Sequence, residues 1–286
     1  MRTSQLAVID TDPDDAVRQS SSVRSGARWD RRPLVPRVSV VIPTLNEAAN
    51  LPHVLSKLPE GIHELVLVDG NSIDGTVEVA RELYPTVRIV GQSGRGKGNA
   101  LASGFEACEG DVIVMIDADG SMDPGEIELF VGALVDGADF VKGSRFMEGG
   151  GSSDITWARR LGNLFFTRFT NLLYRSSYTD LCYGYNAFWA DTLDVINVDC
   201  SGFEVETLIN IRVAKAGLTV AEVPSFERNR IFGESNLRTF RDGFRVLRTI
   251  LRERRPQRPA SASPEILEPA LDLGTFSSRE GSNAAG

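Results

Sequence analysis

Two aspartates separated by one small residue, Asp117 and Asp119, stand directly after the apolar run of residues 112–116. Hard divalent cations such as Mg²⁺ and Mn²⁺ prefer carboxylate oxygens, together with the oxygens of a diphosphate. One of these carboxylates can hold such a metal while the other holds a sugar or a ribose. Asp117 and Asp119, followed by Gly120, would also form an ordinary turn. Their position at the end of a buried strand favours metal binding over a simple turn.

A further carboxylate, Asp69, ends the apolar run of residues 65–68. A carboxylate at a strand tip can accept hydrogen bonds from the edge of a uracil or guanine base. The alternative role of such a residue is to cap a helix, and this role suits Asp74 better, because Asp69 lies earlier in the chain. We therefore interpret Asp69 as a residue that reads a base.

A glycine-rich segment, GRGKG at residues 94–98, has some likeness to a phosphate-binding loop. It lacks the Gly-Lys-Ser/Thr ending of the nucleotide triphosphatases, and it follows the third apolar run rather than the first. Two interpretations stay open. The segment is either a flexible cover over a nucleotide, with Lys97 close to a phosphate, or a mobile loop in solvent.

The elements that must position these residues are strands and helices in alternation, which predicts an α/β fold. Apolar runs predict strands at residues 38–42, 65–68, 87–90, 112–116 and 140–142, and the segments between them predict helices at residues 50–58, 74–83, 99–108 and 127–135. Continuous apolar strands of this kind form a mostly parallel sheet with helices on both faces. Ligands bind beyond the carboxyl ends of such strands. We therefore expect residues 43–47, 69–72, 94–98 and 117–119 to converge on one edge.

Composition excludes several other classes of protein. The net charge of −8 argues against a nucleic-acid-binding protein, which usually carries a basic excess. Cys108, Cys182 and Cys200 form no CxxC pair and have no histidine nearby, which argues against a zinc site. An odd number of scattered cysteines fits a reducing cytosol. We interpret His53 and His63 as surface residues.

The ends of the chain differ in composition from its middle. Residues 1–36 are polar and residues 255–286 are rich in Pro, Ser, Ala and Gly, so we expect two disordered segments around one domain of residues 37–254. No secretory signal is visible, and no run approaches the roughly 20 apolar residues of a membrane span. The expected location is the cytoplasm, either in solution or at the inner face of the membrane.

Seven motifs in order resemble the family-2 inverting glycosyltransferases, and most closely their polyprenol-phosphate (dolichol-phosphate) mannosyltransferase-like members. The motifs are PTLNE, VDGNSIDGT, GRGKGNAL, MIDADGS, KGSRF, GFEVETLI and EVPSFERNRIFGESNL, and the resemblance spans about residues 38–252. It implies a GT-A fold and a nucleoside diphosphate-sugar donor of the GDP-mannose or UDP-glucose type. It also implies Mg or Mn as a cofactor.

The resemblance further implies roles for individual residues on the donor side. Asp117 and Asp119 would hold the metal and the diphosphate-sugar, with Asp119 taking part in catalysis. The remaining donor-side residues are Pro43, Asn46 and Glu47 around the nucleoside, Asp69 at the base, and Arg230 and Ser235 in the segment that closes over the diphosphate.

On the acceptor side, Arg145 resembles an arginine that meets an acceptor phosphate, and Arg159 or Arg160 resembles a second one. Glu206 resembles an acidic residue at the sugar end of the site. Asn236 stands where many relatives carry a lysine, so Arg228 or Arg230 would have to replace that positive charge. The carboxy-terminal membrane domain of some relatives has no counterpart here.

The segment 237–252 is a predicted helix with two adjacent stripes. Its apolar stripe is Leu237, Phe240, Phe244, Leu247 and Leu251, and its basic stripe is Arg238, Arg241, Arg245, Arg248 and Arg252. Such a helix either packs its apolar side on the domain or lies on an anionic membrane surface. Both alternatives stay open at this point.

The reaction we expect is one in-line displacement with inversion at the anomeric carbon. A phosphate acceptor needs no general base, and Arg145 would hold its charge. We predict a lipid-linked polyprenyl phosphate. A soluble or saccharide hydroxyl acceptor would need a base, and Asp180 is the candidate, unless it only stabilises a turn. Rival functions are a nucleotidyltransferase and a non-catalytic nucleotide-sugar-binding protein. The sequence does not indicate an oligomeric state.

Overall fold

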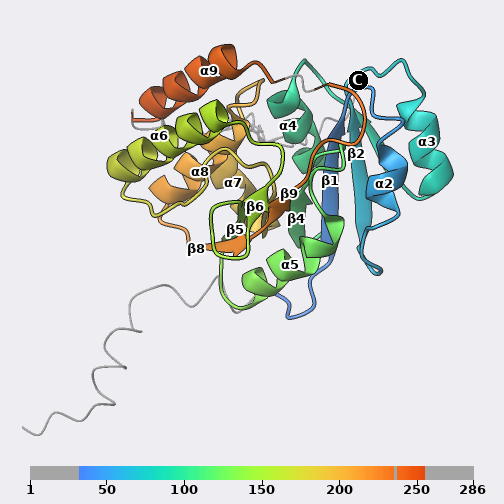
Figure 1. Cartoon of the computed structure of the whole chain (residues 1–286). Helices are drawn as coiled ribbons and strands as arrows, with labels where there is room; N and C mark the ends of the chain where they lie inside the picture. Colours follow the sequence, from blue (N-terminus) through green and yellow to red (C-terminus); the bar gives the residue numbers. More distant parts are fainter. Residues whose placement is uncertain (1–31, 235–236, 255–286) are drawn as a thin grey trace, which may run out of the picture. The chain divides into compact units, whose positions relative to one another are not determined.

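The chain divides into a unit of residues 1–254 and a unit of residues 255–286. The computed structural model describes residues 32–234 and 237–254, all in the first unit (Figure 1). The expected disordered segments therefore fall almost entirely outside the described residues, as do Ser235 and Asn236. Within the expected extension, Arg32 is packed on the domain: it forms ion pairs of 2.8 Å with both Asp139 and Asp191.

A seven-stranded sheet forms the centre of the domain, in the order β3-β2-β1-β4-β7-β5-β8. All neighbouring strands are parallel except β7, which runs antiparallel to both β4 and β5. The prediction of a mostly parallel sheet is confirmed. The strands are β1 (Val38–Thr44), β2 (Glu64–Asp69), β3 (Arg88–Gly91), β4 (Val112–Met115), β5 (Phe140–Ser144), β7 (Asn186–Trp189) and β8 (Val220–Pro224).

Helices cover both faces of this sheet, as expected for its strands, which are apolar on both sides (Figure 1). The helices are α2 (Leu51–Leu55), α3 (Thr76–Leu83), α4 (Lys97–Ala107), α5 (Ile127–Val135), α6 (Trp157–Tyr174), α7 (Leu193–Ile196), α8 (Val205–Lys215) and α9 (Thr239–Arg252). Two 3-10 turns, η2 (Pro124–Glu126) and η3 (Ala190–Thr192), precede α5 and α7. Strands β6 (Gly151–Ser152) and β9 (Phe226–Glu227) form a separate two-stranded sheet.

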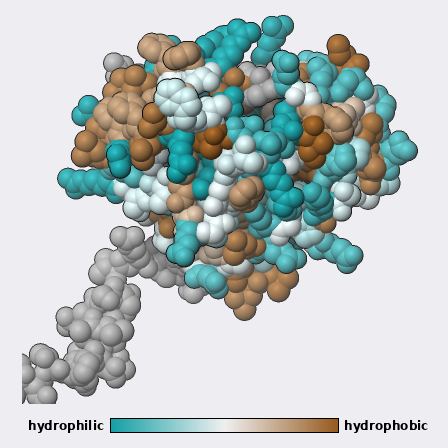
Figure 2. Space-filling model, in the orientation of Figure 1, coloured by the Kyte–Doolittle hydropathy of each residue, from teal (hydrophilic) through white to brown (hydrophobic). Residues whose placement is uncertain are grey.

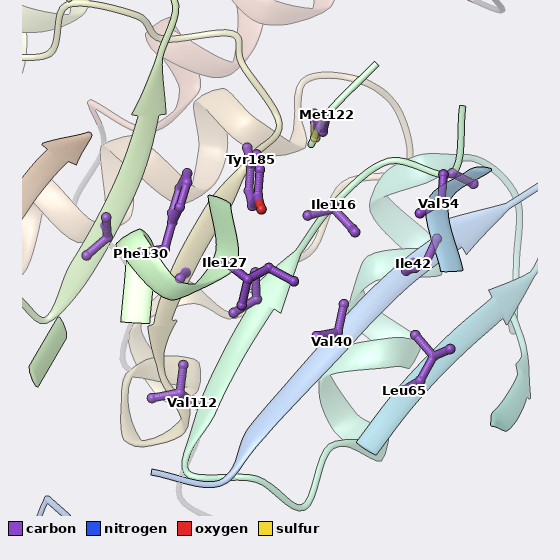
Figure 3. Packing of buried hydrophobic residues seen from close by; sticks show 14 of the residues in the cluster. Val40, Ile42, Val54, Leu65, Val112, Ile116, Met122, Ile127, Phe130 and Tyr185 are labelled. Atoms are coloured by element: carbon purple, nitrogen blue, oxygen red, sulfur yellow. The ribbon is translucent and has the colours of Figure 1, made fainter. Parts of the chain in front are cut away.

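The core lies in layers on the two faces of the sheet. On one face, Ile127 and Phe130 of α5 pack with residues of β1, β2 and β4 (Figure 3). Phe130 also stacks on Tyr185, with 4.2 Å between the ring centroids. On the other face, residues of α4 and α8 form a cluster with residues of β1, β2, β4, β5 and β7. A third cluster joins α8 to α9 through Ile211 and Ile250.

The first βα unit differs from expectation in the length of its helix. Helix α2 begins at Leu51 and ends at Leu55, whereas residues 50–58 were predicted. The Asn50 side chain at its start makes no capping hydrogen bond and donates instead to Glu47 Oε2 at 2.6 Å. Among the described residues, no helix combines the length and the apolar character that crossing a bilayer requires.

Candidate active site

A cavity of about 1000 Å³ lies at the carboxyl edge of the parallel strands. Its lining includes Pro43 near the end of β1 and Leu45 after it, Gly70 after β2, Lys97 after β3 and Asp117 after β4. The predicted convergence of these four segments is thus confirmed. It follows from the parallel pairing of β3, β2, β1 and β4, because parallel strands end at the same edge of a sheet.

Lys97 joins the first aspartate of the acidic pair to α8. Its Nζ lies 2.6 Å from Asp117 Oδ1 and 2.8 Å from Glu206 Oε1. Burial by itself lowers the pKa of Lys97, but the two carboxylates outweigh this effect and raise the pKa above its usual value. Lys97 therefore does not belong to a mobile loop in solvent. It is a fixed cation at the predicted reaction centre.

The second aspartate is held by Arg230. Arg230 Nη1 lies 3.2 Å from Asp119 Oδ2, and its Nη2 contacts Glu47. Burial raises the pKa of Glu47, although hydrogen bonds from Asn50 and Arg230 act in the opposite direction. Glu47, Asp119 and Arg230 come from three distant segments, and they meet at one end of the cavity.

The segment that carries Arg230 lies as a strap across the acidic turn. The backbone N–H of Ile231 donates to the Asp119 carbonyl at 3.2 Å, and that of Phe232 donates to Asn50 Oδ1 at 2.9 Å. Gly120, with φ +77°, adopts a left-handed conformation, and an added Cβ would lie 2.5 Å from Ile231 Cδ1. Glycine suits this position because it adopts a left-handed φ without the strain that an added Cβ would bring.

The acidic pair has the chemistry of a partial metal site. Asp117 and Asp119 both line the cavity, with 30% and 21% of their side chains exposed. No group of three or more acidic, histidine or cysteine side chains suited to a metal ion occurs in residues 32–234 and 237–254. The two carboxylates fit a hard cation whose other ligands are oxygens from a bound diphosphate or from water.

Arg145 and Asp180 form a buried pair beside the cavity. Arg145 Nε and Nη2 donate to the two oxygens of Asp180 at 2.7 and 3.0 Å, and Nη1 lies 3.0 Å from Glu227. Asn163 also donates to Asp180 at 3.0 Å. Burial tends to raise the pKa of Asp180, but the Arg145 guanidinium outweighs it and lowers the pKa.

This geometry does not suit the base role that we considered for Asp180. The side chain is fully buried, it does not line the cavity, and both of its oxygens are already bound. A general base must reach the proton that it removes. Asp180 instead fixes Arg145, which does line the cavity but shares its charge with two carboxylates.

The two other candidate arginines differ in position. Arg159 lines the cavity and forms a 3.4 Å ion pair with Asp154. Arg160 does not line it, and its guanidinium lies 5.5 Å from the centre of the Phe146 ring. Of the two alternatives, Arg159 is the one that faces the cavity.

Asp69 and Asn46, which were expected at the base and the nucleoside, shape the turns after β2 and β1 without lining the cavity. The Asp69 carboxylate accepts from the backbone N–H of Asn71 at 3.0 Å and of Ser72 at 3.1 Å, so it closes its own turn. Asn46 Oδ1 accepts from the N–H of Ile73 at 2.9 Å. If Asp69 reads a base, its carboxylate must bind the base in addition to these backbone N–H groups, or release them. Ser235 lies outside the described residues.

The far part of the cavity is apolar and runs between α6 and α9. Phe165 and Phe166 of α6 face it from one side, and Phe240 and Phe244 of α9 face it from the other. Phe240 is 94% exposed and Phe244 is 69% exposed. The buried side of α9 is a different one, formed by Asp242, Val246, Thr249 and Ile250. The apolar stripe of α9 therefore does not face the core.

Helix α6 extends this apolar surface, and the sequence analysis did not single it out. Brown, hydrophobic surface gathers over α6 and α9 in Figure 2. The exposed apolar side chains of α6 are Trp157, Leu161, Leu164, Phe165 and Leu172. Their spacing of three or four residues from 157 to 165 is a helical pattern that was available in the sequence.

Comparison with known proteins assigns the family. The sequence profile described as Glycosyl transferase family 2 matches residues 39–195, which is over half of the chain. The chain belongs to this family. It is a glycosyltransferase, and its mostly parallel sheet with helices on both faces is the GT-A fold.

Similar proteins come from several sources. An undecaprenyl-phosphate mannosyltransferase of Micrococcus luteus is 32% identical over 70% of this chain and 87% of its own length. A polyprenol monophosphomannose synthase of Mycolicibacterium smegmatis is 32% identical over 70% of this chain and 81% of its own. The solved glucosyl-3-phosphoglycerate synthase of Mycobacterium tuberculosis, in complex with Mn²⁺, UDP and glucosyl-3-phosphoglycerate, is similar in fold. Its TM-score is 0.61 at 23% identity, over 82% of this chain and 86% of that one.

Proposed function

We propose that this glycosyltransferase transfers a hexose from a nucleoside diphosphate-sugar, of the GDP-mannose or UDP-glucose type, to a polyprenyl phosphate. The observation that carries the proposal is the single cavity that joins the acidic pair to the apolar groove between α6 and α9. A polyprenyl phosphate has the matching shape, with a charged head at one end and an apolar chain at the other. The names of the two mannosyl-transferring relatives support the same acceptor class.

On the donor side, Asp117 and Asp119 would hold Mg²⁺ or Mn²⁺ together with the diphosphate. The metal would neutralise the charge that builds on the leaving nucleoside diphosphate. Arg230 and Lys97 are the cations nearest to these carboxylates, and both lie within reach of a diphosphate held there. Glu206 binds Lys97 and lines the cavity, which suits a residue at the sugar end.

On the acceptor side, the phosphate oxygen would attack the anomeric carbon in line with the departing diphosphate. A new C–O bond to the phosphate forms, the C–O bond to the diphosphate breaks, and the configuration inverts. A phosphate is ionised at neutral pH, so no side chain has to remove a proton. This agrees with the buried and fully bonded state of Asp180. Arg145 and Arg159 would attract the acceptor charge.

We also propose that the enzyme works at the inner face of the membrane, attached peripherally. The exposed apolar side chains of α6 and α9 would enter the interface. The arginine stripe that begins at Arg238 follows the apolar stripe along α9, and it would favour anionic lipids by roughly 1 kcal/mol per residue.

A product assay tests the proposal. Purified enzyme with Mn²⁺ is given GDP-mannose or UDP-glucose, and undecaprenyl phosphate in anionic vesicles. The expected product is a glycosyl-phospholipid detected by mass spectrometry, with one free nucleoside diphosphate per turnover. Glycosylation of a soluble hydroxyl acceptor, with none of the lipid product, would refute the acceptor. Release of pyrophosphate would indicate a nucleotidyltransferase, and binding of the donor without turnover would indicate a non-catalytic protein.

A further inference from the structure

A second cavity, of about 610 Å³, lies on the other side of α9 and has no role in the reaction proposed above. Three segments form its walls: the start of α4 with the glycines before it, the segment 198–204, and the arginine stripe of α9. Its charged lining residues are Arg95, Arg245, Arg248 and Arg252 against Asp199 and Glu204.

Two of these four arginines have no carboxylate partner in the described part of the chain. Arg252 lies 3.0 Å from Asp199, and Arg245 lies 4.0 Å from Glu204. No ion pair joins Arg95 or Arg248 to an acidic group within residues 32–234 and 237–254. The lining thus carries two positive charges in excess, in a chain whose net charge is −8.

The loop that carries Arg95 is held in place. Asn99 Oδ1 accepts from the backbone N–H of Gly94 at 2.6 Å, and Asn99 Nδ2 donates to Ser93 Oγ at 3.0 Å. Gly96 has φ +87°, and an added Cβ there would lie 2.1 Å from the Ser201 carbonyl oxygen. This close approach fixes the start of α4 against the segment 198–204. The backbone N–H of Gly98 also donates to the Ser201 carbonyl at 3.2 Å, so the start of α4 is tied to this segment.

We propose that this cavity binds a phosphate-bearing anion between Arg95 and Arg248, with Arg245 nearby. A guanidinium matches two phosphate oxygens in a bidentate geometry. The phosphate can come from two sources. One is a soluble phosphate, and the other is the head group of a membrane lipid, because the same helix also presents its apolar stripe to the outside.

Binding measurements on two variants test this site. Arg95→Gln with Arg248→Gln removes both unpaired charges, and the matched control Arg241→Gln removes a charge from the same helix outside the cavity. In one arm, inorganic phosphate is titrated by calorimetry at constant ionic strength. In the other, binding to phosphatidylcholine vesicles is compared with binding to vesicles that also contain phosphatidic acid. Thermal unfolding verifies that each variant is folded.

We expect the double variant to lose at least about tenfold in affinity for inorganic phosphate, and the control to lose about twofold or less. In the vesicle arm the control should lose about fivefold, which corresponds to the roughly 1 kcal/mol of one stripe arginine, and the double variant should lose more than that. Binding of inorganic phosphate identifies a soluble ligand. Binding that requires phosphatidic acid in the vesicles, without binding of inorganic phosphate, identifies a lipid head group. The proposal is overturned if the wild-type protein binds in neither arm. It is also overturned if the double variant binds like the wild type, or if Arg241→Gln loses as much affinity as the double variant.

Discussion

Each aspartate of the acidic pair is neutralised by a cation from another part of the chain, Asp117 by Lys97 and Asp119 by Arg230. A metal ion that binds Asp119 must therefore compete with Arg230. In Arg230→Gln, we expect Mn²⁺ affinity without nucleotide to rise roughly two- to tenfold, the equivalent of one partly buried ion pair. Turnover should fall, because a counter-charge of the diphosphate is lost. Electron paramagnetic resonance of free Mn²⁺ measures the first effect.

The matched control on the same strap is Arg228→Gln. Arg228 pairs with Asp123 and is 55% exposed, so its loss should leave Mn²⁺ binding unchanged. A lower Mn²⁺ affinity in Arg230→Gln would mean that Arg230 supports the metal site rather than competing for it.

Asp119→Ala should abolish most of the transfer without unfolding the protein, since the side chain lies at the cavity surface. The loss of a charge-stabilising group at a reaction centre costs roughly 10²–10³-fold in rate. Steady-state product formation and thermal unfolding are measured side by side. Near-normal turnover in Asp119→Ala would refute the proposed metal site.

Asp180→Asn tests the structural role of the Arg145 pair. Removing one partner from a buried ion pair costs about 3–5 kcal/mol of unfolding free energy, whereas Asp154→Asn, in the exposed pair with Arg159, should cost about 1 kcal/mol or less. Urea unfolding at pH 7 gives both values. If Asp180→Asn loses as little unfolding free energy as Asp154→Asn, Asp180 does not have the proposed structural role.

The pH dependence of that stability follows from the lowered pKa of Asp180. A carboxyl whose folded pKa lies below its unfolded value, about 3.9 for Asp, stabilises the fold above that value. The contribution is lost as the pH falls through the folded pKa. The difference between wild type and Asp180→Asn should therefore be constant from about pH 5 to 8 and shrink below about pH 4.

Sequence position predicted some site residues and not others. Asp117 and Lys97 were predictable because each follows a strand whose carboxyl end must lie at the ligand edge. The contacts of Arg145 were not, because its partners Asp180 and Glu227 lie 35 and 82 positions away. Pairings over such distances depend on the tertiary fold, and a single sequence carries no local pattern for them.

At the level of elements, the exposed stripe of α9 is the feature to test. Replacing Phe240 and Phe244 by Asp should leave the fold intact, because these side chains are 94% and 69% exposed. Binding to anionic vesicles should fall strongly, since two apolar anchors become charged. Ile73→Asp is the matched control, as Ile73 is 91% exposed and lies outside α6 and α9. If the wild type, the double variant and Ile73→Asp all co-sediment equally with vesicles, α9 is excluded as a membrane anchor.

Whether a strand or helix could be predicted from the sequence depended on which of its faces are buried. Strands β1, β2 and β4 were predicted because strands buried on both faces are continuous apolar runs. Helix α8 was not predicted, since it is buried all round and so has no polar face to give a helical period. Its charged Arg212 is buried with Glu253, at 3.3 Å. Strand β7 begins with the polar Asn186 and has only three apolar residues after it, so it is not a continuous apolar run like that of β4.

For the whole molecule, the charge balance of the acidic pair predicts that metal affects activity but not stability. With EDTA we expect transfer to stop, because the donor diphosphate loses its counter-ion. The melting temperature should change by less than about 2 °C, since Lys97 and Arg230 already pair with the carboxylates. Calorimetry with and without EDTA measures this. A decrease of more than about 5 °C would indicate a structural metal.

The antiparallel strand β7 divides the sheet into a first part, β3-β2-β1-β4, and a second part, β5-β8. The proposed donor residues come mainly from loops of the first part, whereas the apolar groove is built by α6 and α9, which follow β5 in the chain. Glu206 and Arg230 reach back from the later segments to the earlier ones, where they pair with Lys97 and Asp119. Over evolutionary time, substitutions on α6 and α9 can therefore redirect such an enzyme to new acceptors while the donor half stays constant. A chimera that joins two such enzymes at β5 would take its donor preference from the parent of its first part and its acceptor preference from the parent of its second part.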